Sequence, residues 1–227
     1  MEIINKQTYI SACIYNQTVY SDESNYKDIC KELRSNTDTN FVLITHCEHD
    51  NVIEPINIPR NITKWFVSDD SLTHHKKELI PTGMKESHFG LHIPSVLYGN
   101  YLGIFYDPLY ANENKEQIRE AVSKSVRCSL IQKDTMVMNY PHLFEFMIST
   151  TEQEAYTAII GGGIAIVKNK QIFDMYHDAQ ILFVEEWEDI SKSILQQTQA
   201  VFKNKPFKMN TLTPEYWRQK IWKAAGH

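Results

Sequence analysis

The chain has 227 residues, of which 42% are hydrophobic and 22% are charged, with a formal net charge of −5 at pH 7 and a pI of about 6.0. This balance is typical of a globular protein, and the acidic charge argues against a strong general affinity for nucleic acid, which depends on neutralising phosphates. No apolar run reaches the roughly 18 residues that a membrane helix needs, and no signal peptide is recognisable. The sequence therefore predicts a soluble, cytoplasmic protein of one large or two small domains.

The four cysteines are scattered along the chain without a Cys-x-x-Cys pair: they are Cys13, Cys30, Cys47 and Cys128. Paired spacing would favour a metal site or a redox motif, and a secretory signal would favour disulfides. Since neither is seen, we expect four reduced thiols in a cytosol, which is the host cytoplasm if the protein is viral.

The first half of the chain predicts a β-α-β-β segment. Phe41–Thr45 is a short apolar run bounded by turn residues, which is typical of a buried strand. Further strands are expected at Thr8–Tyr15, Thr63–Val67 and Glu78–Ile80. Asn25–Arg34 carries apolar residues at helical spacing and predicts a helix.

The second half alternates strands with helices, which predicts a parallel sheet. Strands are expected at Tyr101–Tyr106, Cys128–Gln132, Ile164–Val167 and Ile181–Val184, with one more ending near Ile148. Helices are expected at Glu113–Val126, Glu152–Ile160 and Glu188–Phe202, with a short helical turn at Ile172–Tyr176. A last helix opens with Thr213 as its N-cap and Pro214 in its first turn.

A domain junction is expected between the two halves. Ser87–Asn100 contains Gly90, Pro94 and Gly99 and shows little periodicity. We therefore predict a first domain over residues 1–93 and a second over residues 94–212, with the last helix in residues 213–227.

One segment of the second domain has the makings of a ligand site. The hydroxyls of Thr150 and Thr151 can cap a helix whose free amides receive an anion such as a diphosphate. Glu154, one turn inside that helix, can accept hydrogen bonds from ribose hydroxyls. Gly161–Gly163 allows close backbone approach before the next strand. The local pattern alone favours a merely structural capped helix, because short motifs often occur by chance.

The wider stretch His142–Ile190 resembles the C-terminal half of exostosin-like glycosyltransferases. Glu154–Tyr156 falls at the family's Glu-Ala-Leu position, and Gly163–Val167 falls on its glycine-initiated strand. Ile181–Val184 falls on a later Leu-Pro-Val-Leu-like strand. This chain lacks the arginine that the family has before the helix, and it has Ala165 in place of the strand proline.

The resemblance implies a GT-B-like α/β fold, in which two Rossmann-like domains with parallel sheets face a central cleft. Residues 1–93 would form the acceptor-side domain, residues 94–212 the nucleotide-sugar-binding domain, and residues 213–227 a helix that crosses back to the first domain. It also implies an inverting transfer from a UDP- or GDP-linked sugar, without a metal or another cofactor. The best known family members are membrane-anchored, and no anchor is seen here, so we expect a short bacterial, phage or large-virus version.

The resemblance adds further donor-side candidates. LGIFYDPLYANENKEQIREAV resembles the family's strand–loop–helix, which puts Lys115 and Arg119 near the donor phosphates. ELIPTGMK resembles its Ile-Pro-Ile-Gly segment, which adds Gly83. Lys115 and Arg119 equally fit a solvated helix face beside Glu116 and Glu120. The predicted donor site consists of Glu154, Thr150, Thr151, Lys115, Arg119 and Gly83.

An inverting transfer needs a base that takes the proton of the acceptor hydroxyl. FVLITHCEHDNVI resembles the family's strand-to-loop segment with a Thr-His-Asn-Ser-Asp pattern. By position in that segment, Asp50 is the first candidate for the base, followed by His46 or Glu48. Each of them also fits a solvated loop residue. His46-x-x-His49 lacks a second pair of ligands, so no metal site is predicted.

The sequence therefore predicts a glycosyltransferase that moves a hexose or pentose from a nucleotide-diphosphate donor to an acceptor hydroxyl. A glycan or glycoprotein is the expected acceptor, and hydroxylated bases of phage-type DNA are an alternative. Two other classes stay open: a non-catalytic nucleotide- or sugar-binding protein of the same fold, and a structural α/β interaction module.

Overall fold

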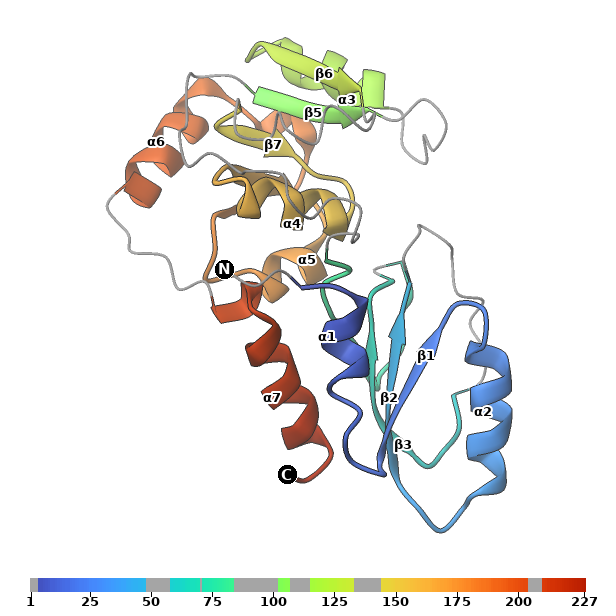
Figure 1. Ribbon diagram of the computed structural model, residues 1–227. Helices are drawn as coiled ribbons and strands as arrows, with labels where there is room; N and C mark the ends of the chain where they lie inside the picture. Colours follow the sequence, from blue (N-terminus) through green and yellow to red (C-terminus); the bar gives the residue numbers. More distant parts are fainter. Residues whose placement is uncertain are drawn as a thin grey trace. The chain divides into compact units, whose positions relative to one another are not determined.

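The computed structural model describes residues 4–47, 58–69, 71–83, 102–106, 115–132, 144–203 and 210–227. The chain divides into two compact units: unit 1 contains Met1–Glu86 and Leu212–His227, and unit 2 contains Ser87–Thr211. Each unit has one sheet, and all of the described strand pairs are parallel (Figure 1). The predicted α/β fold with Rossmann-like parallel sheets is therefore confirmed. The arrangement of two domains around a cleft stays a prediction.

The sheet of unit 1 follows the order β1-β2-β3-β4. Its strands are β1 (Thr18–Asp22), β2 (Phe41–His46), β3 (Ile62–Val67) and β4 (Lys77–Leu79). Helix α2 (Tyr26–Ser35) joins β1 to β2. It packs on the sheet through Tyr26, Cys30 and Leu33, whose spacing of three and four residues places them on one helix face. All residues of β2 are buried, as expected for an apolar strand in the interior of a parallel sheet.

The predicted strand at Thr8–Tyr15 is wrong. The chain forms a short helix there, α1 (Lys6–Ile10), and the first strand of the sheet is β1. Asn5 explains the difference, because its side chain accepts a hydrogen bond from Thr8 N at 3.1 Å while Asn5 N donates to Thr8 Oγ1 at 3.2 Å. This reciprocal cap starts a helix in a segment whose β-branched residues would otherwise favour a strand.

The last helix, α7 (Pro214–Ala224), packs against α1 within unit 1 (Figure 1). Thr213 caps it and Pro214 is its first residue, as the sequence predicts. Trp222 Nε1 donates a hydrogen bond to Ala12 O at 3.0 Å. The two chain segments that form unit 1 are thus joined by helix packing and a direct hydrogen bond.

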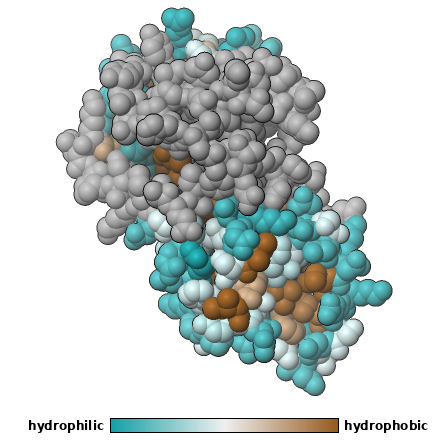
Figure 2. Space-filling view, viewed as in Figure 1, coloured by the Kyte–Doolittle hydropathy of each residue, from teal (hydrophilic) through white to brown (hydrophobic). Residues whose placement is uncertain are grey.

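Part of the surface of unit 1 is apolar. Among its described residues, the exposed large apolar side chains are Ile10 and Ile14, at the end of α1 and just after it. Figure 2 shows apolar side chains gathered on one face of unit 1 and surrounded by hydrophilic ones. Nothing in the described part of the chain shows what covers this face, so it indicates no partner.

An ion-pair cluster ties α7 to the sheet of unit 1. Glu78 lies in β4, an edge strand of this sheet, and its carboxylate contacts the ammonium groups of both Lys64 and Lys220. Burial alone would raise the pKa of Glu78, but the hydrogen bonds and charges of Lys220 and Lys64 outweigh it and lower the pKa below the ordinary value. The charged form of Glu78 therefore stabilises the folded state.

We expect Glu78→Gln to lower the free energy of unfolding by about 1 kcal/mol at neutral pH, since the carboxylate is only partly exposed. The folded-state pKa is the lower one, so this stabilisation is present above the unfolded pKa of about 4.3 and is lost as the pH falls through the folded value. Urea unfolding of both proteins at neutral and acid pH measures it. Glu215→Gln, which changes an exposed carboxylate of α7, is the control. A difference between wild type and Glu78→Gln that is independent of pH would contradict this role.

The sheet of unit 2 follows the order β6-β5-β7-β8-β9. Its strands are β5 (Leu102–Tyr106), β6 (Cys128–Gln132), β7 (Phe146–Ile148), β8 (Ile164–Val167) and β9 (Ile181–Phe183). Numbered within the unit this order is 2-1-3-4-5, one of the two common doubly wound orders. Strands β6 and β7 lie on opposite sides of β5, so the winding of the sheet reverses between β5 and β7.

The helices of unit 2 are α3 (Lys115–Ser123), α4 (Glu152–Ile160), α5 (Lys170–Met175) and α6 (Lys192–Lys203). Ile118 and Val122 of α3 and Leu195 of α6 share one apolar cluster with the strands. Helix α4 contacts β7 and β8, where strand alternation turns Met147 and Ala165 away from that cluster. The predicted single helix over 188–202 is interrupted: a 3₁₀ turn at Trp187–Asp189 precedes α6.

All four cysteines lie in the described part of the chain and are free thiols. No helix in the part of the chain that the structure describes has the length and apolar character that a membrane crossing requires.

Candidate functional site

The carboxyl ends of β5 and β7 meet at the point where the winding of the unit 2 sheet reverses. The chain leaves β5 at Tyr106 and enters α3 at Lys115. It leaves β7 at Ile148 and enters α4 at Glu152. In open α/β sheets, ligands bind outside the carboxyl ends of the strands at such a reversal. The position therefore identifies this edge as the candidate site before any side chain is considered.

The loop between β7 and α4 is short and held on both sides. Ser149 N donates to Ile166 O of β8 at 2.9 Å, and Ser149 Oγ donates to Met147 O at 3.3 Å. Thr151 is the N-cap of α4 with extended backbone angles, and its Oγ1 accepts a hydrogen bond from Glu154 N at 3.3 Å. The polar residues at this edge thus stand on a fixed turn between a buried strand and a helix.

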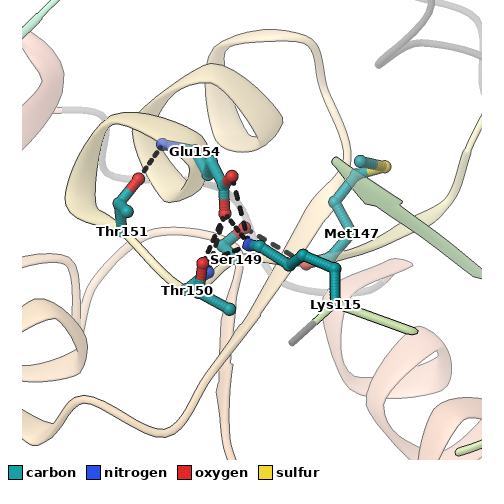
Figure 3. A network of polar contacts seen from close by, with 6 residues as sticks. All are labelled: Lys115, Met147, Ser149, Thr150, Thr151 and Glu154. Carbon is teal, nitrogen blue, oxygen red and sulfur yellow. Dashed lines mark hydrogen bonds and ion pairs between the residues drawn. The ribbon is translucent and has the colours of Figure 1, made fainter. Parts of the chain in front are cut away.

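Glu154 is the centre of a compact polar network (Figure 3). Its Oε2 accepts hydrogen bonds from Thr150 N at 2.8 Å, from Thr150 Oγ1 at 3.1 Å and from Lys115 Nζ at 3.0 Å. Its Oε1 lies 3.3 Å from Lys115 Nζ. Lys115 Nζ also donates to Thr150 Oγ1. The network joins α3 to the β7–α4 loop through one carboxylate, one ammonium and one hydroxyl.

The Lys115–Glu154 ion pair is buried, with 8% of Lys115 and 5% of Glu154 exposed. Removing one partner of such a pair costs about 3–5 kcal/mol, because the other charge is left without compensation. The helix dipole favours Glu154 in the first turn of α4 but disfavours a cation at the first residue of α3. The helix dipole therefore does not explain a buried lysine at the start of α3. The ion pair with Glu154 stabilises the Lys115 ammonium there.

The structure brings together four of the residues that the sequence predicts at the donor site: Lys115, Thr150, Thr151 and Glu154. Arg119 is exposed one turn along α3 and is not a member of the network in Figure 3. Its charge acts instead on Cys128. Burial raises the pKa of the Cys128 thiol more than the charge of Arg119 lowers it, and the resulting pKa is about 11. Whether any of these residues binds a donor stays a prediction.

The two other predicted site residues that the structure describes lie in unit 1. His46 ends β2 and is buried, with its Nε2 2.8 Å from Thr82 O and its ring 5.3 Å from that of Tyr9. A carbonyl oxygen only accepts, so Nε2 carries the proton in this contact. Gly83 follows Thr82 with a φ of +76°, and its backbone packs directly on that of Ile4. Both residues thus have structural contacts within unit 1. The roles of His46 as a base and of Gly83 in donor binding stay predictions.

The predicted bases Glu48 and Asp50 lie outside the described residues, as does His49. Within the described part of the chain, no group of three or more His, Cys, Asp or Glu side chains is arranged to hold a metal ion.

One basic residue at this edge of the sheet is not predicted from the sequence. Lys168 directly follows β8, and its Nζ pairs with Glu186 at 2.5 Å and lies 5.7 Å from the centre of the Trp187 ring. A lysine immediately after a predicted buried strand is the signal that could identify it.

The chain matches no protein-family model, and no curated protein is significantly similar to it in sequence.

Proposed function

We propose that the protein is a glycosyltransferase that takes its sugar from a nucleotide-diphosphate donor. The donor diphosphate would bind where the carboxyl ends of β5 and β7 meet in unit 2, which we call the β5/β7 edge. The observation that carries this proposal is the position of Lys115, Thr150, Thr151 and Glu154. All four stand at the reversal point of a doubly wound sheet, at the starts of α3 and α4. The order of segments that resembles exostosin-like transferases supports the choice of a sugar nucleotide over other anionic ligands.

The groups at this edge fit one requirement of the transfer, which is stabilisation of the leaving diphosphate. The acceptor oxygen forms a bond to C1 of the sugar while the bond from C1 to the diphosphate oxygen breaks, and the acceptor proton passes to a base. The leaving diphosphate needs positive potential, which the Lys115 ammonium and the start of α4 would supply. The acceptor is a hydroxyl of a glycan, a glycoprotein or a hydroxylated base, and each is a separate arm of the test.

Incubation with a panel of UDP- and GDP-linked sugars, with and without these acceptors, tests the proposal. Release of UDP or GDP that depends on both sugar nucleotide and acceptor is the expected result. Binding of UDP or GDP without any turnover would instead make the protein a non-catalytic nucleotide-binding protein. Absence of any response to every nucleotide would overturn both.

The base is proposed to be Asp50, by its place after β2 in the family-like segment. We expect Asp50→Ala to reduce kcat by about 100-fold or more and to leave the affinity for the donor unchanged, because a base acts on the acceptor proton and not on the diphosphate. Steady-state kinetics and UDP titration measure the two quantities. Asp38→Ala, at an exposed position of unit 1, is the control. Full activity in Asp50→Ala would exclude this residue as the base.

A further inference from the structure

We infer that the Glu154 carboxylate competes with the donor for its own binding site, and that a donor phosphate binds by displacing this carboxylate from Lys115 and Thr150. This inference rests on the proposed diphosphate site and specifies how that site selects its ligand. Glu154 would then set the affinity by competition, in addition to any contact it makes with the nucleoside.

The hydrogen bonds around Glu154 carry the inference. The Lys115 ammonium has three N–H donors, and its described contacts are Glu154 Oε1, Glu154 Oε2 and Thr150 Oγ1. The amide and the hydroxyl of Thr150 are directed at the same Oε2. The cationic and polar donors of this network therefore all converge on one carboxylate, in the way that donors of an anion site converge on a phosphate.

A carboxylate and a phosphate oxygen accept the same charge-assisted bonds, at similar lengths. Replacing Glu154 by a phosphate group would keep Lys115 paired and would keep both Thr150 donors satisfied. A diphosphate brings more charge and more acceptor oxygens than a carboxylate, whereas a monovalent anion brings no advantage. The exchange therefore favours diphosphate ligands over small anions of the cell.

Release of Glu154 also gives its predicted ribose contact a mechanism. Once a phosphate holds Lys115 and Thr150, the freed carboxylate has lost its hydrogen bonds from these two residues and can accept bonds from ribose hydroxyls. A nucleoside diphosphate would then recover part of what the displacement costs, and inorganic diphosphate would not. Comparing the affinity for inorganic diphosphate with the affinity for a nucleoside diphosphate therefore separates the competition by Glu154 from its contact with ribose.

Calorimetric titration of inorganic diphosphate and of UDP into the full chain tests the inference. Glu154→Gln keeps an acceptor for Thr150 but removes the competing charge, so it should bind inorganic diphosphate about tenfold more tightly than the wild type. The gain for UDP should be smaller, because the ribose loses an ionised acceptor. Glu116→Gln removes one negative charge from an exposed position of α3 and should change neither affinity.

Glu154→Asp provides a second variant in case Glu154→Gln does not fold with Lys115 left unpaired. Its charge is retained, but the carboxylate is withdrawn by one methylene, so diphosphate should bind about threefold more tightly. Unchanged or weaker diphosphate binding in the folded variant would overturn the inference. The proposed function would still stand if the wild type releases UDP or GDP from a sugar nucleotide in the presence of an acceptor. If neither wild type nor variants bind inorganic diphosphate, UDP or GDP, the inference and the proposed function both fail.

Discussion

Lys115→Met is expected to weaken UDP binding by about 100-fold or more. Loss of one partner of a buried, hydrogen-bonded charge pair costs about 2–5 kcal/mol in binding, and Lys115 is the described cation at the centre of the proposed diphosphate site. Methionine keeps most of the length of the apolar stem and removes the ammonium. Calorimetric titration of UDP measures the loss, and Lys124→Met, at an exposed position just after α3, is the matched control.

The same substitution should also destabilise the protein, because it leaves the Glu154 carboxylate buried without its cation. We expect a loss of about 3–5 kcal/mol in the free energy of unfolding. The double variant Lys115→Met/Glu154→Gln removes both charges and should recover most of this stability while UDP binding stays lost. Wild-type affinity for UDP in the folded double variant would show that Lys115 is a structural residue only.

Gly83→Ala is expected to cause a large loss of stability in unit 1. A β-carbon at this position would lie 2.1 Å from Ile4 O and 2.6 Å from Ile4 C, closer than any real contact, and the neighbour is backbone that cannot rotate away. The φ of +76° adds a cost of about 1–2 kcal/mol for any side chain. Together these effects predict a decrease of about 3 kcal/mol or more in the free energy of unfolding.

Gly162→Ala separates the two causes. Gly162 also has a positive φ, of +83°, but a β-carbon added there would meet no atom within 4 Å beyond its own chain neighbours, so only the backbone cost of about 1–2 kcal/mol applies. Urea unfolding of both variants measures the difference. Equal losses at the two glycines would contradict close packing of Gly83 on Ile4.

Much of unit 2 can be predicted from the sequence because its signals are local. The predicted helix Glu152–Ile160 and strand Ile164–Val167 have the bounds seen in the structure. The hydroxyl cap and the glycines mark both ends of that helix, and the strand is a run of apolar, mostly β-branched residues. The cap and proline that open α7 are local in the same sense.

The errors have physical reasons of a different kind. Thr8–Tyr15 has the composition of a strand, but the cap at Asn5 starts helix α1, which ends at Ile10, and turns and irregular backbone follow up to β1. The helix expected after Trp187 is interrupted because a tight turn with its own reciprocal cap ends at Ile190.

The site itself can be predicted only as separate parts. Lys115 and Glu154 are each predicted as donor residues, but the sequence does not give the order of strands in the sheet. That order places β5 beside β7 and brings these two residues, 39 positions apart in sequence, into contact through one ion pair. This ion pair changes the role expected of Glu154 as an acceptor for ribose hydroxyls, because its carboxylate already accepts hydrogen bonds from Lys115 and Thr150.

A crystal structure of the protein with UDP tests the central claim most directly. The diphosphate is expected within hydrogen-bond distance of Lys115 Nζ and Thr150 N, with the Glu154 carboxylate displaced from both. UDP bound elsewhere on the chain, with the Lys115–Glu154 pair intact, would contradict a donor site at the β5/β7 edge.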